Sequence, residues 1–147
     1  MLNKHDYDIL SSAIEQAQKS PVLMRHGCIA ARHGKLLAKG FNHYRTYSKC
    51  GIIKNTCTCH AECHVVHQLN NLGITDFKKI KLYIVRINRR NDLRSSAPCV
   101  DCYNLLVKVG VKTIIYSTGN GFQKTKLADF TPTQITKGRQ FLNGDFD

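Results

Sequence analysis

The chain has 147 residues, 42% of them hydrophobic, which is typical of one domain that buries its own core. We therefore expect a single domain over residues 1–147. No segment reaches the roughly 20 apolar residues of a membrane-spanning helix, and the first residues lack the apolar stretch of a secretory signal. These exclusions favour a cytoplasmic protein without a membrane partner.

The chain is also strongly basic. Its net charge is +12 at pH 7, which favours anionic partners such as nucleotides or nucleic acid. No acidic residue occurs between Glu15 and Glu62, so this segment should carry a positive potential. For any single basic side chain in it, a solvated surface that aids solubility is the better explanation.

The first third of the chain predicts a helix followed by a hairpin. Apolar residues recur at helical spacing after Asp6 and Asp8 and stop before a proline, which predicts an amphipathic helix over residues 6–19. Two apolar runs, residues 28–32 and 35–41, flank the turn residues His33-Gly34 and predict an antiparallel pair of strands.

The middle of the chain predicts alternating elements. We expect a loop over 42–59, a helix over 60–72, a strand over 80–87, a helix over 99–109 that closes at Gly110, and a strand over 111–116. After Tyr116 the pattern weakens, and residues 117–121 read as a loop. Strands that alternate with helices indicate a parallel part of the sheet, while the early hairpin indicates an antiparallel edge. The predicted class is therefore α/β with a mixed sheet.

Two short motifs combine residues that bind zinc and move protons. His60-Ala61-Glu62 starts one predicted helix, and Pro98-Cys99-Val100-Asp101-Cys102 starts the next. One imidazole and two thiolates would thus converge from adjacent helix starts, whose positive dipole ends favour thiolate. Three protein ligands, namely His60, Cys99 and Cys102, leave a fourth position open for water, as in catalytic zinc sites. A redox dithiol or half of a structural zinc site is the alternative for the two cysteines.

Glu62 is predicted to act as a general acid and base, not as a metal ligand. At a helix start its carboxylate can reach water bound to the metal, although it lies only two positions from His60. It would take the proton of the water and deliver it to the ring nitrogen of a substrate base. The same carboxylate would then help ammonia to leave.

On these motifs, over about residues 5–117, the chain resembles the cytidine deaminase-like superfamily and most closely its deoxycytidylate deaminase group. H-x-E followed by P-C-x-x-C is the signature of zinc nucleobase deaminases. The resemblance implies a three-layer fold with a five-stranded mixed sheet, zinc on the three ligands above, and Glu62 as proton shuttle. It also implies that Asn42 contacts the sugar of the substrate and that the carbonyl of Ala61 accepts from its amino group. Without the resemblance Asn42 would read as an ordinary turn residue.

Departures from the family pattern leave the choice of substrate open. A histidine as first ligand resembles the deoxycytidylate, transfer-RNA, guanine and polynucleotide branches more than the free-cytidine branch. Cys63 and His64 stand where a small or amide residue is common, and Ser96-Ala97 stand where an aromatic residue is frequent. Tyr116 could stack on a base, although a core aromatic is the better reading.

The remaining cysteines suggest a second metal site. Seven cysteines, an odd number, indicate metal ligation or buried thiols more than disulfides in a reducing compartment. By resemblance to deoxycytidylate deaminases with a structural zinc, a second Zn²⁺ is a candidate near Cys50, Cys57 and Cys59, with histidines nearby. Reduced or buried thiols explain these cysteines equally well.

Three functions follow from the sequence. The first is a zinc-dependent deaminase of a cytosine nucleotide such as CMP or dCMP, with the basic segment before Glu62 receiving the phosphate. The second is a deaminase of transfer RNA or single-stranded nucleic acid, whose backbone would follow that segment and Arg86, Arg89, Arg90 and Arg94. The third is a catalytically silent zinc module in which Cys57 or Cys59 closes the coordination shell. Resemblance to the family also favours a homo-oligomer.

Overall fold

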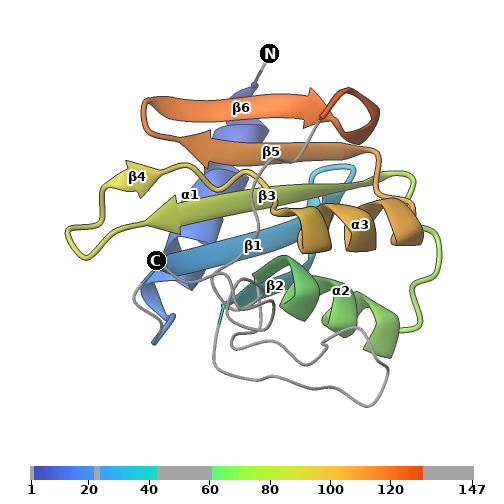
Figure 1. Cartoon of the computed structure of the whole chain (residues 1–147). Helices are drawn as coiled ribbons and strands as arrows, with labels where there is room; N and C mark the ends of the chain where they lie inside the picture. Colours follow the sequence, from blue (N-terminus) through green and yellow to red (C-terminus); the bar gives the residue numbers. More distant parts are fainter. Residues whose placement is uncertain (1, 22–23, 43–60, 131–147) are drawn as a thin grey trace, which may run out of the picture.

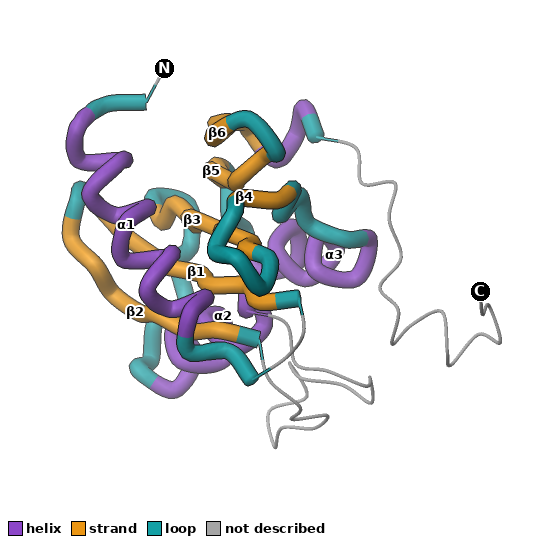
Figure 2. Tube along the Cα trace, turned by 90° about the vertical axis from the view of Figure 1, so that its left-hand side faces the viewer, coloured by secondary structure: helices purple, strands orange, loops and turns teal. Residues whose placement is uncertain are grey.

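The computed structural model of the chain describes residues 2–21, 24–42 and 61–130, and these form three layers. Helix α1 (Lys4–Gln18) covers one face of a central sheet, while α2 (Ala61–Asn71) and α3 (Val100–Val109) lie on the other face, as Figure 1 and Figure 2 show. The predicted α/β class is confirmed. None of the helices in this part of the chain is long and apolar enough to cross a membrane.

The central sheet is mixed, as predicted. Its strands are β1 (Arg25–Arg32), β2 (Lys35–Phe41), β3 (Ile80–Ile87), β4 (Leu93–Arg94), β5 (Thr113–Thr118) and β6 (Gly121–Lys126). They follow the order β2-β1-β3-β5-β6, with the short β4 paired to β3. Only β3 and β5 are parallel among the described pairs, and the others are antiparallel. Within residues 2–21, 24–42 and 61–130 the sheet therefore has six strands, one more than the resemblance implied, because β4 adds a two-residue pairing.

Helix α1 begins earlier than the apolar spacing indicated because its start is fixed by a capping box. The side chain of Asn3 accepts from the backbone N–H of Asp6 at 2.9 Å, and the Asp6 carboxylate accepts from the N–H of Asn3 at 3.0 Å. The apolar face of the helix packs directly on β1 at Gly27. A side chain at Gly27 would collide with the backbone of Ala13 and Ala17, so this helix and strand need a glycine there.

The region after Tyr116 differs from the prediction. Residues 117–121 do not form one loop, because β5 continues to Thr118 and β6 starts at Gly121 after a two-residue turn. Strand β6 pairs only with β5 in the described structure, and its middle residues are exposed and polar. An edge strand with one solvated side lacks the apolar alternation that would have revealed it.

Two cores hold the layers together. Apolar residues of β1, β3 and β5 alternate between the two faces, so Ile84 and Tyr116 pack under α2 and α3, while Tyr83 and Ile115 pack under α1. Helix α3 ends at Gly110, which takes the left-handed conformation with φ of 94°, as the sequence predicted. The carboxyl ends of the parallel strands β3 and β5 thus lie at the end of the sheet where α2 and α3 begin.

Candidate active site

Helices α2 and α3 run side by side and begin at the same end of the sheet (Figure 1). This is the end where β3 finishes and where its parallel neighbour β5 also finishes. In open α/β sheets, binding sites form at the carboxyl ends of parallel strands. The fold therefore brings the two predicted motifs to one edge of the sheet, although they lie far apart in the sequence.

The two predicted cysteine ligands are buried at the start of α3. Cys99 is the N-cap residue, and its sulfur accepts from the backbone N–H of Cys102 at 3.5 Å. Cys99 is 8% exposed and Cys102 is fully buried. Both thiols therefore sit on the first turn of one helix, where the positive helix dipole favours negative charge.

A pair of serines holds the segment that leads into Cys99. The Ser96 hydroxyl donates to the carbonyl of Ile84 at 2.8 Å, and the Ser117 hydroxyl donates to the carbonyl of Arg94 at 2.7 Å. The backbone N–H of Ser96 donates to the carbonyl of Ser117 at 2.9 Å, which completes the link to β5. In the sequence Ser96 stands out only because the family often has an aromatic residue there, and Ser117 carries no motif. The only sequence feature that could have indicated these two serines is their position as polar residues next to buried strands.

Glu62 is the second residue of α2 and is only 4% exposed. Its carboxylate makes no hydrogen bond to another described residue. Burial raises the pKa of the Cys28 thiol, and the nearby charge of Glu62 raises it further. The same charge adds to the raised pKa of Cys102. A largely buried carboxylate that makes no hydrogen bond to a described residue can accept from a bound ligand or water molecule.

The protein groups around Cys102 favour its protonated form. Contact with the Cys63 thiol, then with the Cys99 thiol, then burial, raise the pKa of Cys102 well above its ordinary value. These contacts therefore oppose the negative charge that the helix start favours. A bound cation would supply the missing positive charge, because metal-ligating thiols are deprotonated.

The described donors fit zinc in their chemistry but are fewer than a complete site. Two buried thiols are soft ligands of the kind that zinc prefers, and Glu62 lies beside them. His60, the third predicted ligand, falls outside the described residues, as do Cys50, Cys57 and Cys59 of the candidate second site. In the ranges 2–21, 24–42 and 61–130, no group of three or more histidine, cysteine or acidic side chains is arranged to hold a metal ion.

Asn42 lies at the same edge of the sheet, and its side-chain amide makes hydrogen bonds to other residues of the chain. The side-chain oxygen accepts from the Ser20 hydroxyl at 2.6 Å and from the backbone N–H of His26 at 2.9 Å. The amide nitrogen donates to the carbonyl of Met24 at 2.7 Å and lies 3.4 Å from Nδ1 of His26. Asn42 is therefore a structural link between β2 and the start of β1, whatever else it contacts. The sequence did not identify Ser20 and His26 as its partners.

The two other residues considered from the sequence are both buried. Ala61 is the first residue of α2 and is fully buried. Tyr116 is 8% exposed and belongs to the core under α2 and α3, with its ring centroid 5.9 Å from that of Phe130. The core reading of Tyr116 is confirmed.

One family model matches most of the chain. Residues 3–118 match the model of the cytidine and deoxycytidylate deaminase zinc-binding region. No curated protein gives a significant match to the chain.

Solved structures with a similar fold include deaminases of two kinds. The apo dCMP deaminase of cyanophage S-TIM5 is 21% identical, with 79% of this chain and 84% of that chain covered and a TM-score of 0.57. The cytidine deaminase of Burkholderia pseudomallei is 14% identical, with 91% and 100% covered and a TM-score of 0.66. That of Mycobacterium leprae is 20% identical, with 86% and 98% covered and a TM-score of 0.59. At these identities the likeness shows the fold alone.

Proposed function

Because the chain belongs to the cytidine and deoxycytidylate deaminase zinc-binding family, we propose that it is a zinc-dependent hydrolytic deaminase of a cytosine nucleotide. It would convert CMP, dCMP or a similar nucleotide to the uracil form with release of ammonia. The observation that carries this proposal is the buried carboxylate of Glu62, which has no hydrogen-bond partner in the described part of the chain and lies beside the thiols of α3.

In this proposal His60, Cys99 and Cys102 hold one zinc ion. When bound there, zinc supplies the Lewis acidity that makes water a nucleophile at neutral pH. The two described ligands support the assignment because they lie one helical turn apart and are linked by the bond from the N–H of Cys102 to the sulfur of Cys99.

Glu62 would carry protons in both halves of the reaction. Its carboxylate takes one proton from the attacking water and delivers it to N3 of the cytosine ring. It then takes the second proton from the same oxygen and gives it to the leaving amino group, which departs as ammonia. The carboxylate ends in its starting form, and the 4% exposure of Glu62 supports a site that excludes bulk water.

Asn42 and Ala61 would orient the substrate, Asn42 at the sugar and the carbonyl of Ala61 at the amino group. Among the contacts of the Asn42 amide, the 3.4 Å approach to the His26 ring is the longest. A sugar hydroxyl would replace this contact most easily, because the other amide contacts are 2.6 to 2.9 Å long. Asn42 would then bind substrate while it keeps its structural bonds.

Release of ammonia tests the proposal. Zinc-loaded protein is incubated separately with CMP, dCMP, cytidine, guanine and a short single-stranded oligonucleotide, and the product is identified by chromatography. Conversion of a cytosine nucleotide to its uracil form with equal ammonia release supports the proposal. Release from guanine alone, or from none of the substrates at full zinc occupancy, would rule it out.

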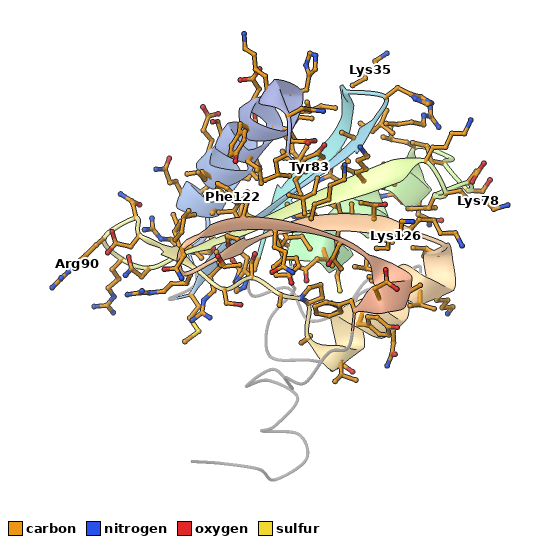
Figure 3. The ribbon with its side chains drawn as sticks, turned by 90° about the horizontal axis from the view of Figure 1, so that it is seen from above. Lys35, Lys78, Tyr83, Arg90, Phe122 and Lys126 are labelled. Atoms are coloured by element: carbon orange, nitrogen blue, oxygen red, sulfur yellow. The ribbon has the colours of Figure 1, made fainter. Side chains whose placement is uncertain are left out.

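A polynucleotide deaminase is the second candidate. Arg89 and Arg90 are exposed in the loop between β3 and β4, and Figure 3 shows Arg90 reaching away from the sheet. Such side chains could contact a phosphate backbone, and the affinity would then fall steeply with salt. The oligonucleotide arm of the assay, repeated at two salt concentrations, separates this candidate from the first.

A further inference from the structure

Four side chains form a row across the sheet edge that carries the candidate active site. His26 of β1 lies opposite Arg86 of β3, and Arg86 lies opposite Arg94 of β4. Asn42 continues the row beyond β1, because its backbone N–H donates to the carbonyl of His26 at 3.2 Å. The proposed sugar-binding residue and two arginines thus occupy neighbouring strand ends.

Arg86 projects on the same face of the sheet as α2 and α3. Side chains two positions apart on a strand share a face, and Ile84 belongs to the core under these helices. The same argument applies to His26, which lies two positions before Cys28 of that core. The row therefore lies on the face covered by α2 and α3 and not on the face covered by α1.

The guanidinium of Arg86 is held in place but not neutralised. It contacts the sulfur of Met24 at 3.0 Å and the carbonyl of Ser95 at 3.5 Å. Within the described chain it has no carboxylate partner. Burial, and then the positive charge of Arg94, lower the pKa of Arg86. Two adjacent guanidinium groups repel each other, and an anion placed between them would relieve this repulsion.

A hollow of about 470 Å³ opens beside this pair. Its charged lining consists of four arginines and one carboxylate, namely Arg86, Arg89, Arg90, Arg94 and Asp92. Met24 lies between the hollow and the candidate active site, because its carbonyl accepts from the Asn42 amide while its sulfur contacts Arg86. One residue therefore separates the proposed sugar contact from a positively charged hollow large enough for a phosphate and its water.

We propose that Arg86 and Arg94 form the subsite for the phosphate of the substrate nucleotide. The inference rests on the proposed deaminase function and sharpens it, since the substrate must then be a phosphorylated nucleotide and not a nucleoside or a free base. Planar guanidinium groups donate paired hydrogen bonds to phosphate oxygens, which a lysine cannot do. The phosphate contact thus lies at the ends of β3 and β4 and not in the basic segment that precedes Glu62.

The test compares CMP with cytidine in the zinc-loaded protein and in three variants. Arg86→Gln and Arg94→Gln should each lower kcat/KM for CMP by about ten- to a hundredfold, the loss expected for charge-assisted hydrogen bonds. Both variants should leave the lower kcat/KM for cytidine unchanged. Arg32→Gln is the matched control, because Arg32 is an exposed arginine at the opposite end of β1. It should behave as the wild type with both substrates.

Several results would overturn the inference. Equal kcat/KM for CMP and cytidine in the wild type, or an unchanged preference in both arginine variants, would remove the subsite but leave the deaminase intact. An effect of Arg86→Gln on an oligonucleotide but not on CMP would assign the arginines to a strand instead. Arg94 is exposed, so Arg94→Gln keeps the test valid if Arg86→Gln lowers the melting temperature.

Direct binding separates failure of the inference from failure of the proposed function. If neither CMP nor cytidine is deaminated, the deaminase proposal fails, and calorimetry with CMP then decides the subsite. A tenfold weaker affinity for CMP in Arg86→Gln, with unchanged affinity in Arg32→Gln, would still support it. Equal affinity for CMP in the wild type and both arginine variants would refute it.

Discussion

In the part of the chain that the structure describes, each face of the sheet buries one carboxylate, and the two carboxylates differ in their partners. Asp6, on the side of α1 that faces the sheet, is 2% exposed and accepts from the backbone N–H of Asn3 and from the Tyr83 hydroxyl at 2.7 Å. Glu62, on the other face, is 4% exposed and has no hydrogen-bond partner in the described chain. A carboxylate whose bonds are made within the protein stabilises the fold, whereas an unpartnered one is available for chemistry.

The pKa shifts of Asp6 and Tyr83 agree with a structural role for their hydrogen bond. Burial acts to raise the pKa of Asp6, but the bonds from Asn3 and Tyr83 and nearby lysines outweigh it, so the pKa is lowered. Burial, and then the bond to Asp6, raise the pKa of Tyr83. Figure 3 shows Tyr83 beneath α1. Both groups are thus held in the forms that make their shared hydrogen bond.

We expect the largest effect from the removal of Cys99, which is a proposed metal ligand. We expect Cys99→Ala to lower the zinc content by about one equivalent, to abolish deamination, and to lower stability, because metal binding is coupled to folding. Zinc content is measured by atomic absorption and stability by thermal unfolding. Cys63→Ser is the control, since Cys63 contacts Cys102 but is not a proposed ligand. Equal loss of zinc in both variants would contradict the ligand assignment.

Asp6→Asn should damage stability and spare chemistry. The variant loses two charge-assisted bonds in a buried position, so we expect the free energy of unfolding to fall by about 2 kcal/mol. Urea unfolding measures the change, and the deamination rate of the folded fraction should stay at the wild-type value. A lower rate at full folding would show that Asp6 does not act on stability alone.

Tyr83→Phe should have a smaller effect of the same kind. It removes one hydroxyl and leaves the bond from Asn3 to Asp6, so the expected loss is about 1 kcal/mol in urea unfolding. In an Asp6→Asn background the same substitution should cost less, because the partner carboxylate has already been altered. Fully additive losses would mean that the hydroxyl and the carboxylate do not interact.

The pH dependence of stability should carry the smallest signal. Because the pKa of folded Asp6 lies below its ordinary value of 3.8, its contribution is complete above about pH 4 and is lost as the pH falls through the folded pKa. Between pH 5 and pH 3 the wild type should therefore lose more stability than Asp6→Asn. Parallel pH profiles for the two proteins would show that Asp6 is not linked to folding in this way.

The sequence predicted the helices and strands whose apolar residues recur with a clear period. It also predicted the family from the H-x-E and P-C-x-x-C motifs. The hairpin at His33-Gly34 is confirmed, because positive φ angles of 53° and 77° at these residues suit a two-residue turn. The predicted parallel part of the sheet is confirmed by the pairing of β3 with β5, which α3 connects. In contrast β6 was missed, since its polar edge residues carry no apolar alternation.

Much of the site depends on contacts between residues that are far apart in the sequence, and local sequence patterns do not predict such contacts. The spacing of the motifs predicts that Glu62 lies near the cysteines. It does not predict the hydrogen bonds between Ser96 and Ser117, which hold the segment that precedes Cys99. The row that joins Asn42 to Arg86 depends on strand register, which local patterns do not specify. His60, Cys50, Cys57 and Cys59 lie outside the described residues, so their roles stay predictions.

The most direct test of the account is the rate of ammonia release by zinc-loaded Glu62→Gln, measured with the nucleotide on which the wild type is most active. The account predicts a rate lower by roughly a hundred- to ten-thousandfold, the contribution of a general acid and base, with unchanged zinc content and stability. Deamination at the wild-type rate, or loss of zinc from this variant, would contradict the central claim that Glu62 carries protons and is not a ligand.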